Sequence, residues 1–296
     1  MIFDTPAYCL SLPHLGQPFP VASLVSPLLL RPIPGTDHND AIGPWPYASA
    51  PSPARLAGVL EELRTTSLVT ATLFVRPDAT AGWLGNEEGP PLPGVEAVRL
   101  KDHYVLDPAL PRPGRRPKTR RNLAIAARHW RISPVPHTQL AELGAQFQNQ
   151  LAARRHISPI ADVPAGHFAV LAGLNGIETM AAVDEDGIGA LLIAARAHGE
   201  THLLHLFTAP RVVRTCGTYL LMATALDQWS RDGCVYLGGA PSSADGPGIA
   251  KFKARWANRT AAAMLLKVIL NTSLYQHLTD ARPATSFFPA YRGHDA

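Results

Sequence analysis

The chain has 296 residues, of which 46% are apolar, and it carries a formal net charge of +4. The apolar fraction suffices for a sizeable core and excludes wholesale disorder, and the length fits one large domain or two of about 150 residues. Cys9, Cys216 and Cys234 lack metal-binding spacing and are odd in number, which favours a reducing compartment. We see no cationic leader and no apolar stretch of membrane-spanning length, so we expect a cytoplasmic protein.

The first half of the chain is rich in proline and irregular. Prolines interrupt the apolar segment 20–33, which predicts short strands near a sheet edge, and 35–47 reads as a loop with rigid and aromatic residues. Apolar residues at helical spacing follow Ser52 and predict a helix as far as position 63. Residues 67–75 and 97–106 predict strands, with a loop over 86–94, so this half reads as a reduced α/β unit.

Residues 112–131 hold eight cations and no acid. A helix is expected to begin at Pro117, which places Lys118, Arg120 and Arg121 in its first turn, where unpaired backbone N–H groups also favour anions. These three cations are candidate contacts for the phosphates of a tRNA. The alternative is a solvated face or a linker, which such charge runs usually are.

The second half predicts a regular α/β order, and we place the boundary between halves at 136/137. Helices are expected over 138–155 and 163–174, and a hairpin at 184–187 joins strands 177–183 and 188–195. A strand over 201–208, a basic loop over 209–217, a helix ending near Gly233 and a buried strand over 234–237 follow. Residues 1–136 are then a degenerate half, on the acceptor side or a buttress, and 137–296 the acyltransferase domain.

The basic loop is a candidate site for a phosphate-bearing donor. A helix N-terminus offers unpaired N–H groups and a positive dipole end, to which arginine side chains add fixed charge. The candidate donor-binding residues here are Arg211, Arg214, Thr215, Gly217 and Thr218. Arg214-x-x-Gly217-x-Tyr219 resembles the Gln/Arg-x-x-Gly-x-Gly/Ala pattern with which GNAT acyltransferases hold acyl coenzyme A, except that Tyr219 replaces a small residue.

The order of motifs after this helix resembles the FemAB-like aminoacyltransferases of the GNAT superfamily. The motifs are Gly238-Gly239, Asp245-Gly246 and Phe252-Lys253-x-x-Trp256. The resemblance implies an α/β, GNAT-like fold of two tandem halves with mixed central sheets. It also implies aminoacyl-tRNA as co-substrate, with no permanently bound cofactor.

The same resemblance suggests roles for individual residues. Lys253 would stabilise the oxyanion or contact the tRNA terminus, and Asp245 would hold the acceptor amine or act as a base; an Asp-Gly turn explains Asp245 equally well. Phe252 and Trp256 would stack on the terminal adenine, although core packing is the alternative for both. The candidate acceptor-binding residues are Asp40, Trp45, Tyr47, Gly238 and Gly239.

Other catalytic classes lack their motifs in this sequence. There is no Gly-x-Ser-x-Gly elbow, His-Glu-x-x-His, Walker loop or Gly-x-Gly-x-x-Gly. His202 and His205 lie three apart on a predicted strand and are expected to face opposite sides, so we interpret them as structural and expect no metal site.

Three functions are compatible with the sequence. The first is transfer of an aminoacyl group from aminoacyl-tRNA to an amine, hydroxyl or hydroxylamine of a small metabolite or a peptidoglycan precursor. The absence of a heptad-repeat arm favours the metabolite, as in natural product biosynthesis. The second is acyl coenzyme A-dependent N-acylation, and the third is a non-catalytic RNA-binding or scaffold role.

Overall fold

The computed structural model describes residues 1–47, 51–79, 92–154, 157, 159–241, 244–280, 285 and 287–293. The strands are β1 (Gln17–Phe19), β2 (Leu28–Pro32), β3 (Asn39–Ile42), β4 (Leu68–Val75), β5 (Val95–Leu106), β6 (Arg131–Pro134), β7 (Ile177–Asp184), β8 (Gly187–Ala197), β9 (Glu200–Thr208), β10 (Cys234–Tyr236) and β11 (Arg259–Ile269). The predicted loop over 86–94 falls mostly outside the described residues.

The α-helices follow the apolar periodicity of the sequence at most predicted places. They are α1 (Pro6–Leu10), α2 (Pro53–Arg64), α3 (Pro117–His129), α4 (His137–Ala152), α5 (Ala165–Gly173), α6 (Pro210–Thr215), α7 (Gly217–Trp229), α8 (Gly246–Lys253) and α9 (Thr272–Asp280). None of the helices within the described ranges is long and apolar enough to span a bilayer.

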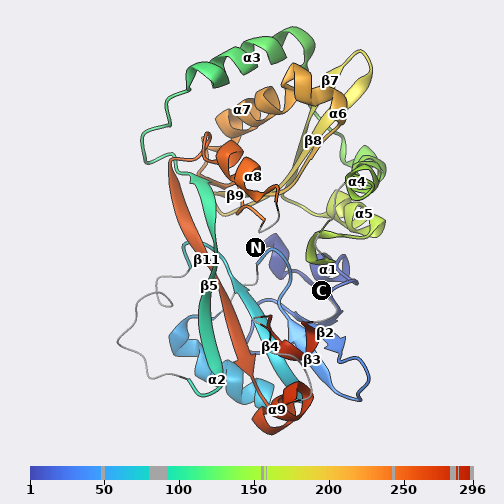
Figure 1. Ribbon diagram of the computed structural model, residues 1–296, viewed down its shortest axis with the longest axis vertical. Helices are drawn as coiled ribbons and strands as arrows, with labels where there is room; N and C mark the ends of the chain where they lie inside the picture. The colour runs from blue at the N-terminus through green and yellow to red at the C-terminus, as the bar shows by residue number, and fades with distance from the viewer. Residues whose placement is uncertain are drawn as a thin grey trace.

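All of these strands belong to one mixed sheet of 11 strands in the order β1-β2-β3-β4-β11-β5-β10-β9-β8-β7-β6. The long strands β5 and β11 pair with each other and connect the two ends of the molecule (Figure 1). The mixed α/β class is confirmed, and the two expected sheets are joined into one because β5 also pairs with β10.

The sheet is covered by helices on faces that the strand alternation sets. Alternate residues of β8 pack either against α7 or against α4 and α5, and α2 covers the end of the sheet formed by β4 and β11. All eight residues of β4 are buried, as the run of β-branched and apolar residues predicts. The candidate site described below lies in the middle of the sheet, where β10 ends beside β9.

The chain crosses between the two halves on both sides of the predicted boundary. Helix α3 precedes His137 but contacts α7, and β6 pairs with β7. Strand β11 lies between β4 and β5, and α9 contacts β4. The division at 136/137 stays a prediction, and in space each half takes elements from both parts of the sequence.

Two local predictions are wrong. Residues 210–215 form helix α6 rather than a loop, because Pro210 at its first position has a φ suited to helix and needs no N–H partner. Residues 39–42 of the predicted aromatic loop form β3, which is stabilised by pairing with β2 and β4. Tertiary pairing of this kind leaves no local signal in a polar segment such as Asn39-Asp40.

Candidate active site

The candidate site begins where two parallel strands separate. Residues 234–236 of β10 pair with residues 200–202 of β9, after which β10 ends while β9 continues to Thr208. Parallel strands that part in this way leave a crevice beyond their carboxyl ends. A cavity of about 280 Å³ lies there, between residues 203–206 and 237–239.

Two β-bulges shape this cavity. Leu204 of β9 has no partner on β8, since the register passes from Leu203 to His205, and Leu100 of β5 is likewise skipped opposite β11. A bulge leaves one residue outside the ladder and bends its strand. Both bulge residues line the cavity, so the two irregularities face the same space.

The turn after β10 depends on its two glycines. Gly238 has a φ of +73°, which favours glycine, and a Cβ on Gly239 would lie 2.6 Å from a carbon of the Lys101 side chain. Backbone hydrogen bonds from Leu237 N to Tyr104 O (2.8 Å) and from Tyr104 N to Gly238 O (3.3 Å) fix the turn to β5. Both predicted glycines therefore line the cavity through backbone atoms.

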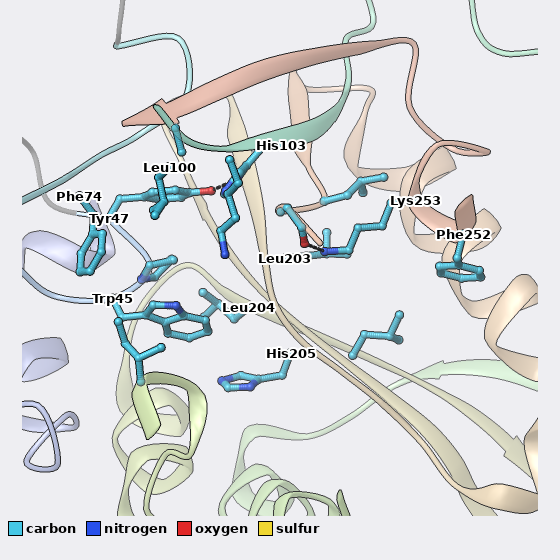
Figure 2. A pocket seen from close by; sticks show the side chains of 18 of the residues that line it. Trp45, Tyr47, Phe74, Leu100, His103, Leu203, Leu204, His205, Phe252 and Lys253 are labelled. Carbon is cyan, nitrogen blue, oxygen red and sulfur yellow. Dashed lines mark hydrogen bonds between the residues drawn. The ribbon is translucent and has the colours of Figure 1, made fainter. Parts of the chain in front are cut away.

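Lys253, the last residue of α8, points into the cavity and donates a 2.7 Å hydrogen bond from Nζ to the Gly239 carbonyl oxygen (Figure 2). Burial, and then the nearby charge of Lys101, lower the pKa of Lys253 to about 8. Near neutral pH this group can therefore stabilise an oxyanion as an ammonium and can also exchange a proton.

The opposite wall carries aromatic and imidazole groups. Trp45 and Tyr47 line the cavity as predicted, and the Tyr47 hydroxyl lies 2.5 Å from His103 Nδ1 (Figure 2). Tyr8 donates from its hydroxyl to the Trp45 carbonyl oxygen at 2.8 Å. Burial lowers the pKa of His103 to about 3, so this imidazole is neutral. The Tyr47–His103 pair is therefore neutral, whereas Lys101 on the same wall carries a positive charge.

The expectation for His202 and His205 is wrong in one respect. The bulge at Leu204 shifts the alternation of β9, so both rings lie on the same face, where His202 contacts Tyr47 and His205 contacts Trp45. His205 Nε2 lies 3.3 Å from His167 Nε2, and burial holds the pKa of His205 well below its usual range. No cluster of metal-ligating side chains occurs among the residues that the structure describes.

A second cavity, of about 490 Å³, adjoins the first between α7 and α8. Leu206, Gly239, Phe252 and Lys253 line both cavities. Among the predicted donor residues, Thr218 lines this second cavity, and its Oγ1 lies 3.1 Å from Thr208 Oγ1. Lys253 and Phe252 therefore lie at the junction of two spaces.

The corner between α6 and α7 is packed on Trp130. Cys216 has a left-handed backbone (φ +58°), and a Cβ on Gly217 would lie 2.9 Å from the Trp130 ring. Thr215 Oγ1 accepts a 2.9 Å hydrogen bond from Trp130 Nε1. Gly217 and Thr215 thus fix the start of α7 and do not line either cavity.

The two arginines of the predicted donor loop differ in their surroundings. Arg211 forms an ion pair with Asp184, donates to the Gly187 carbonyl oxygen (3.0 Å) and lies over the Trp130 ring. Arg214 is exposed and lines neither cavity. Arg211 therefore anchors the β7–β8 hairpin to α6, and Arg214 is the more accessible of the two.

Two aromatic side chains, Tyr219 and Phe252, line the second cavity. Tyr219 makes edge contacts with Phe252 and Trp256, at ring-centre distances of 5.5 and 6.0 Å, and its hydroxyl accepts a hydrogen bond from Arg255. Phe252 lines both cavities, whereas Trp256 is 6% exposed and belongs to the core. Only one of the two predicted stacking residues is accessible to a base.

Asp245 and Lys253 lie at opposite ends of α8. A helix rises about 1.5 Å per residue, so the eight steps from Asp245 to Lys253 span about 12 Å. Asp245 is exposed at the N-cap and lines neither cavity. The structure does not bring the two predicted catalytic residues together.

Asp40 is fully buried in an ion-pair network instead of lining the cavity of Trp45 and Tyr47. Its carboxylate accepts hydrogen bonds from Arg31 Nε (2.7 Å) and Arg292 Nε (2.6 Å). The Tyr291 hydroxyl also donates to Asp40, at 3.1 Å. Asp40 therefore joins β2 and β3 to the C-terminal segment.

The three cations at the start of α3 are exposed on the outside of the molecule. Helix α3 packs on α7, so Lys118, Arg120 and Arg121 lie on the same end of the molecule as the second cavity (Figure 1). Arg115, earlier in the same basic segment, pairs with Asp227 of α7 at 3.3 Å. This ion pair fixes the segment before α3 to α7, and the three exposed cations of α3 lie outside it.

Sequence reasoning missed several residues of the site. Lys101 and His103 alternate on β5 and both line the first cavity, a relation that period-2 alternation of the predicted strand could have shown. Trp130, Arg255 and the bulge residues carry no such signal, because their roles depend on contacts with distant segments.

No family model matches the sequence, and neither does any curated protein sequence.

Solved structures do match the fold. The crystal structure of FemX, at 11% identity and a TM-score of 0.62, aligns over 85% of this chain and 86% of its own. The C-terminal domain of a putative lysylphosphatidylglycerol synthetase from Agrobacterium fabrum has 13% identity and a TM-score of 0.55, over 83% of this chain and 81% of its own. L-PGS from Bacillus licheniformis has 13% identity and a TM-score of 0.53, over 88% of each chain. The chain therefore has a FemX-like fold of the GNAT type.

Proposed function

We propose that the protein transfers an aminoacyl group from aminoacyl-tRNA to the amine or hydroxyl of a small molecule. The observation that carries the proposal is that Lys253 lies where two cavities meet, one between α7 and α8 and one between the two halves of the sheet. Two substrates entering from the two sides would meet at this side chain. The FemX-like fold and the Phe252-Lys253 motif support the same chemistry.

The reaction needs few protein groups. The acceptor nitrogen or oxygen attacks the ester carbonyl of the donor, the new bond forms, the ester C–O bond breaks, and the ribose oxygen leaves. The proton lost by the nucleophile passes to that oxygen. Lys253 as an ammonium would stabilise the tetrahedral oxyanion, a role whose removal typically costs ~10²-fold or more in rate. The neutral His103 and Tyr47 wall would position the acceptor.

The second cavity suits the end of a tRNA. Phe252 presents a ring there, and stacking on a base is worth ~1 to 3 kcal/mol. Lys118, Arg120 and Arg121 are exposed on the neighbouring α3, where phosphates at a distance from the reacting ester could bind. Tyr219 and Arg255 occupy space beside the first turn of α7, where the coenzyme A pattern has a small residue.

Acyl coenzyme A-dependent N-acylation is the second candidate. The exposed Arg214 and the N-terminus of α7 favour it, because together they offer charge and unpaired N–H groups to a pyrophosphate. Asp245 remains a candidate for binding an acceptor amine only if the acceptor reaches the far end of α8.

Transfer assays with Lys253 variants test the proposal. Bulk tRNA charged with labelled amino acids, and separately labelled acetyl coenzyme A, are incubated with the protein and a panel of small amines. We expect label transfer from tRNA, reduced ~10²-fold or more by Lys253→Ala. The control is Lys251→Ala, an exposed lysine of the same helix, which should retain activity. Transfer from coenzyme A alone, or full activity of Lys253→Ala, would refute it.

A further inference from the structure

A third cavity, of about 430 Å³, lies beside the first in the half of the sheet formed by β4 and β11. Phe74, Leu100 and Ile160 line both the first and the third cavity, so the two spaces are adjacent. The third cavity is largely apolar, and His14 lies near its boundary with the first cavity, 3.4 Å from the Ile160 carbonyl oxygen. The other polar lining residues come from β2, β4, β11 and the C-terminal segment, and we call this part the polar end.

The polar end carries cations and no acid. Arg31, Arg292 and Lys267 line the cavity, together with His14, and no carboxylate among the described residues does so. Arg31 and Arg292 share the single carboxylate of Asp40, and Lys267 pairs with Glu96 at 3.1 Å. Three cations therefore face two acids, which leaves one positive charge without a counterion in this group.

Thr72 adds a hydroxyl that has no internal partner. It is 3% exposed and lines the third cavity, and its Oγ1 has no hydrogen-bond partner among the described residues. A buried polar group without a partner costs stability unless a ligand or water satisfies it. Thr72 pairs in register with Lys267 on β11, so the hydroxyl and the ammonium belong to the same part of the cavity.

The guanidinium groups are held in place for recognition. The side chains of Arg31 and Arg292 are only 19% and 15% exposed, and both are fixed by the fully buried Asp40. Arg292 uses Nε and Nη2 on Asp40 and on the Pro32 carbonyl oxygen. Arg31 uses Nε on Asp40, so among the described residues the other terminal nitrogens of the two groups are left for a ligand. Guanidinium N–H groups match the oxygens of carboxylates and phosphates, and fixed side chains lose less entropy on binding. Asp40 thus acts on the cavity as a positioning residue for two arginines.

We propose that the third cavity binds the oxyanion end, a carboxylate or phosphate, of an apolar acceptor molecule. Arg31, Arg292 and Thr72 hold the oxyanion, and the apolar body lies along Phe74, Leu100 and Ile160 towards the first cavity. From Ala263, which lines the first cavity, to Lys267, the strand spans about 13 Å. The acceptor is about this long. That its other end carries the reacting amine or hydroxyl rests on the proposed function.

Binding of a matched pair of fluorescent probes tests this site without any donor. The probes are 11-(dansylamino)undecanoic acid and its neutral counterpart N-undecyl dansylamide, which lacks only the carboxylate. We expect the acid to bind wild-type protein about tenfold more tightly or better, as hydrogen bonds to charged groups imply. Acetate and inorganic phosphate, which lack the apolar body, should displace it only weakly.

Variants locate the binding. Thr72→Val keeps the shape of the side chain and removes the hydroxyl, and Lys267→Gln removes a charge outside the Asp40 network. Each variant should weaken binding of the acid several-fold and leave binding of the neutral probe unchanged. Leu265→Trp should fill the cavity and weaken binding of both probes. Arg292→Gln should weaken binding of the acid most. Because this variant also removes an ion-pair partner of the buried Asp40, the test relies on Thr72→Val and Lys267→Gln.

Three results would overturn the proposal. The first is equal affinity of the protein for the two probes, and the second is an affinity for the acid that neither Thr72→Val nor Lys267→Gln changes. The third is displacement of the bound acid by acetate as effectively as by an excess of the acid itself. Lys251→Gln, at an exposed lysine that does not line the third cavity, is the control and should bind both probes like the wild type. Because no tRNA is present, failure of aminoacyl transfer leaves this result standing, and failure of probe binding leaves the transfer assay standing.

Discussion

The two walls of the first cavity are built in different ways. The C-terminal wall, formed by residues 203–206, 237–239, 252 and 253, comes from segments close together in the sequence and holds the titratable Lys253. The N-terminal wall, formed by residues 45–47, 74, 100, 101, 103 and 160, comes from scattered segments, and its imidazole, His103, stays neutral. Under the proposed function, the C-terminal wall would supply the reacting group, and the N-terminal wall would position the acceptor.

The elements that carry the C-terminal wall pack on Trp130, and removing this side chain should have the largest effect on the free energy of unfolding. Trp130 is 4% exposed and contacts the start of α7 and Gly189 of β8. Trp130→Ala should lower the free energy of unfolding by about 3 to 5 kcal/mol, because it leaves a large cavity. Urea denaturation measures this. Thr215→Val, which removes only the partner of the indole N–H, should cost about 1 to 3 kcal/mol, and an equal loss in both would contradict the packing argument.

Phe252 is the accessible aromatic of the C-terminal wall, and Trp256 is its buried neighbour. Phe252→Leu should weaken binding of charged tRNA by about 1 to 3 kcal/mol without changing the melting temperature much, because the ring is only half-buried. Filter binding and thermal melts report the two effects. If Phe252→Leu instead destabilised the fold and bound tRNA normally, Phe252 would be a core residue like Trp256.

The N-terminal wall depends on a hydrogen bond. Tyr47→Phe leaves the buried His103 Nδ1 without its partner and should cost about 1 to 3 kcal/mol in the free energy of unfolding. Replacing both residues, as in Tyr47→Phe with His103→Leu, should cost less than the sum of the two single changes. Additive losses would show that the pair does not interact.

The smallest expected effect is on the pH profile. If the ammonium form of Lys253 is active, kcat/KM should fall as the pH rises through about 8, because the pKa of Lys253 lies there. Lys101→Gln removes a neighbouring positive charge, so the pKa of Lys253 should rise and the falling limb should move to higher pH. Lys251→Gln should leave the limb in place, and a shift in the opposite direction with Lys101→Gln would contradict the assignment.

The sequence predicted the C-terminal wall better than the N-terminal wall for a physical reason. Gly238, Gly239, Phe252 and Lys253 lie within 16 residues of one another, and backbone conformation in a turn and a short helix brings them together. Trp45 and Tyr47 were also predicted and do line the cavity. Lys101 and His103 were not predicted. Alternation along the strand could have put them on one face, but a strand placed from propensity alone has no partner and no register, so the sequence does not show what that face meets.

The errors have the same origin. The opposite facing of His202 and His205 followed from regular alternation, and a single bulge at Leu204 reversed it. Asp40 was expected at the acceptor, whereas the structure places it beneath two arginines of the third cavity through a contact with a residue 252 positions away. Neither a bulge nor a contact of that separation leaves a local signal.

Donor binding tests the central claim most directly. The protein is mixed with bulk charged tRNA and separately with acetyl coenzyme A, and binding is measured against salt concentration, for the wild type and for Lys118→Gln with Arg120→Gln and Arg121→Gln. We predict that the wild type binds tRNA with an affinity that falls steeply with salt, and that the triple variant loses most of it and shows a shallower slope. Tight coenzyme A binding that Arg214→Gln abolishes and the triple variant retains would contradict the account.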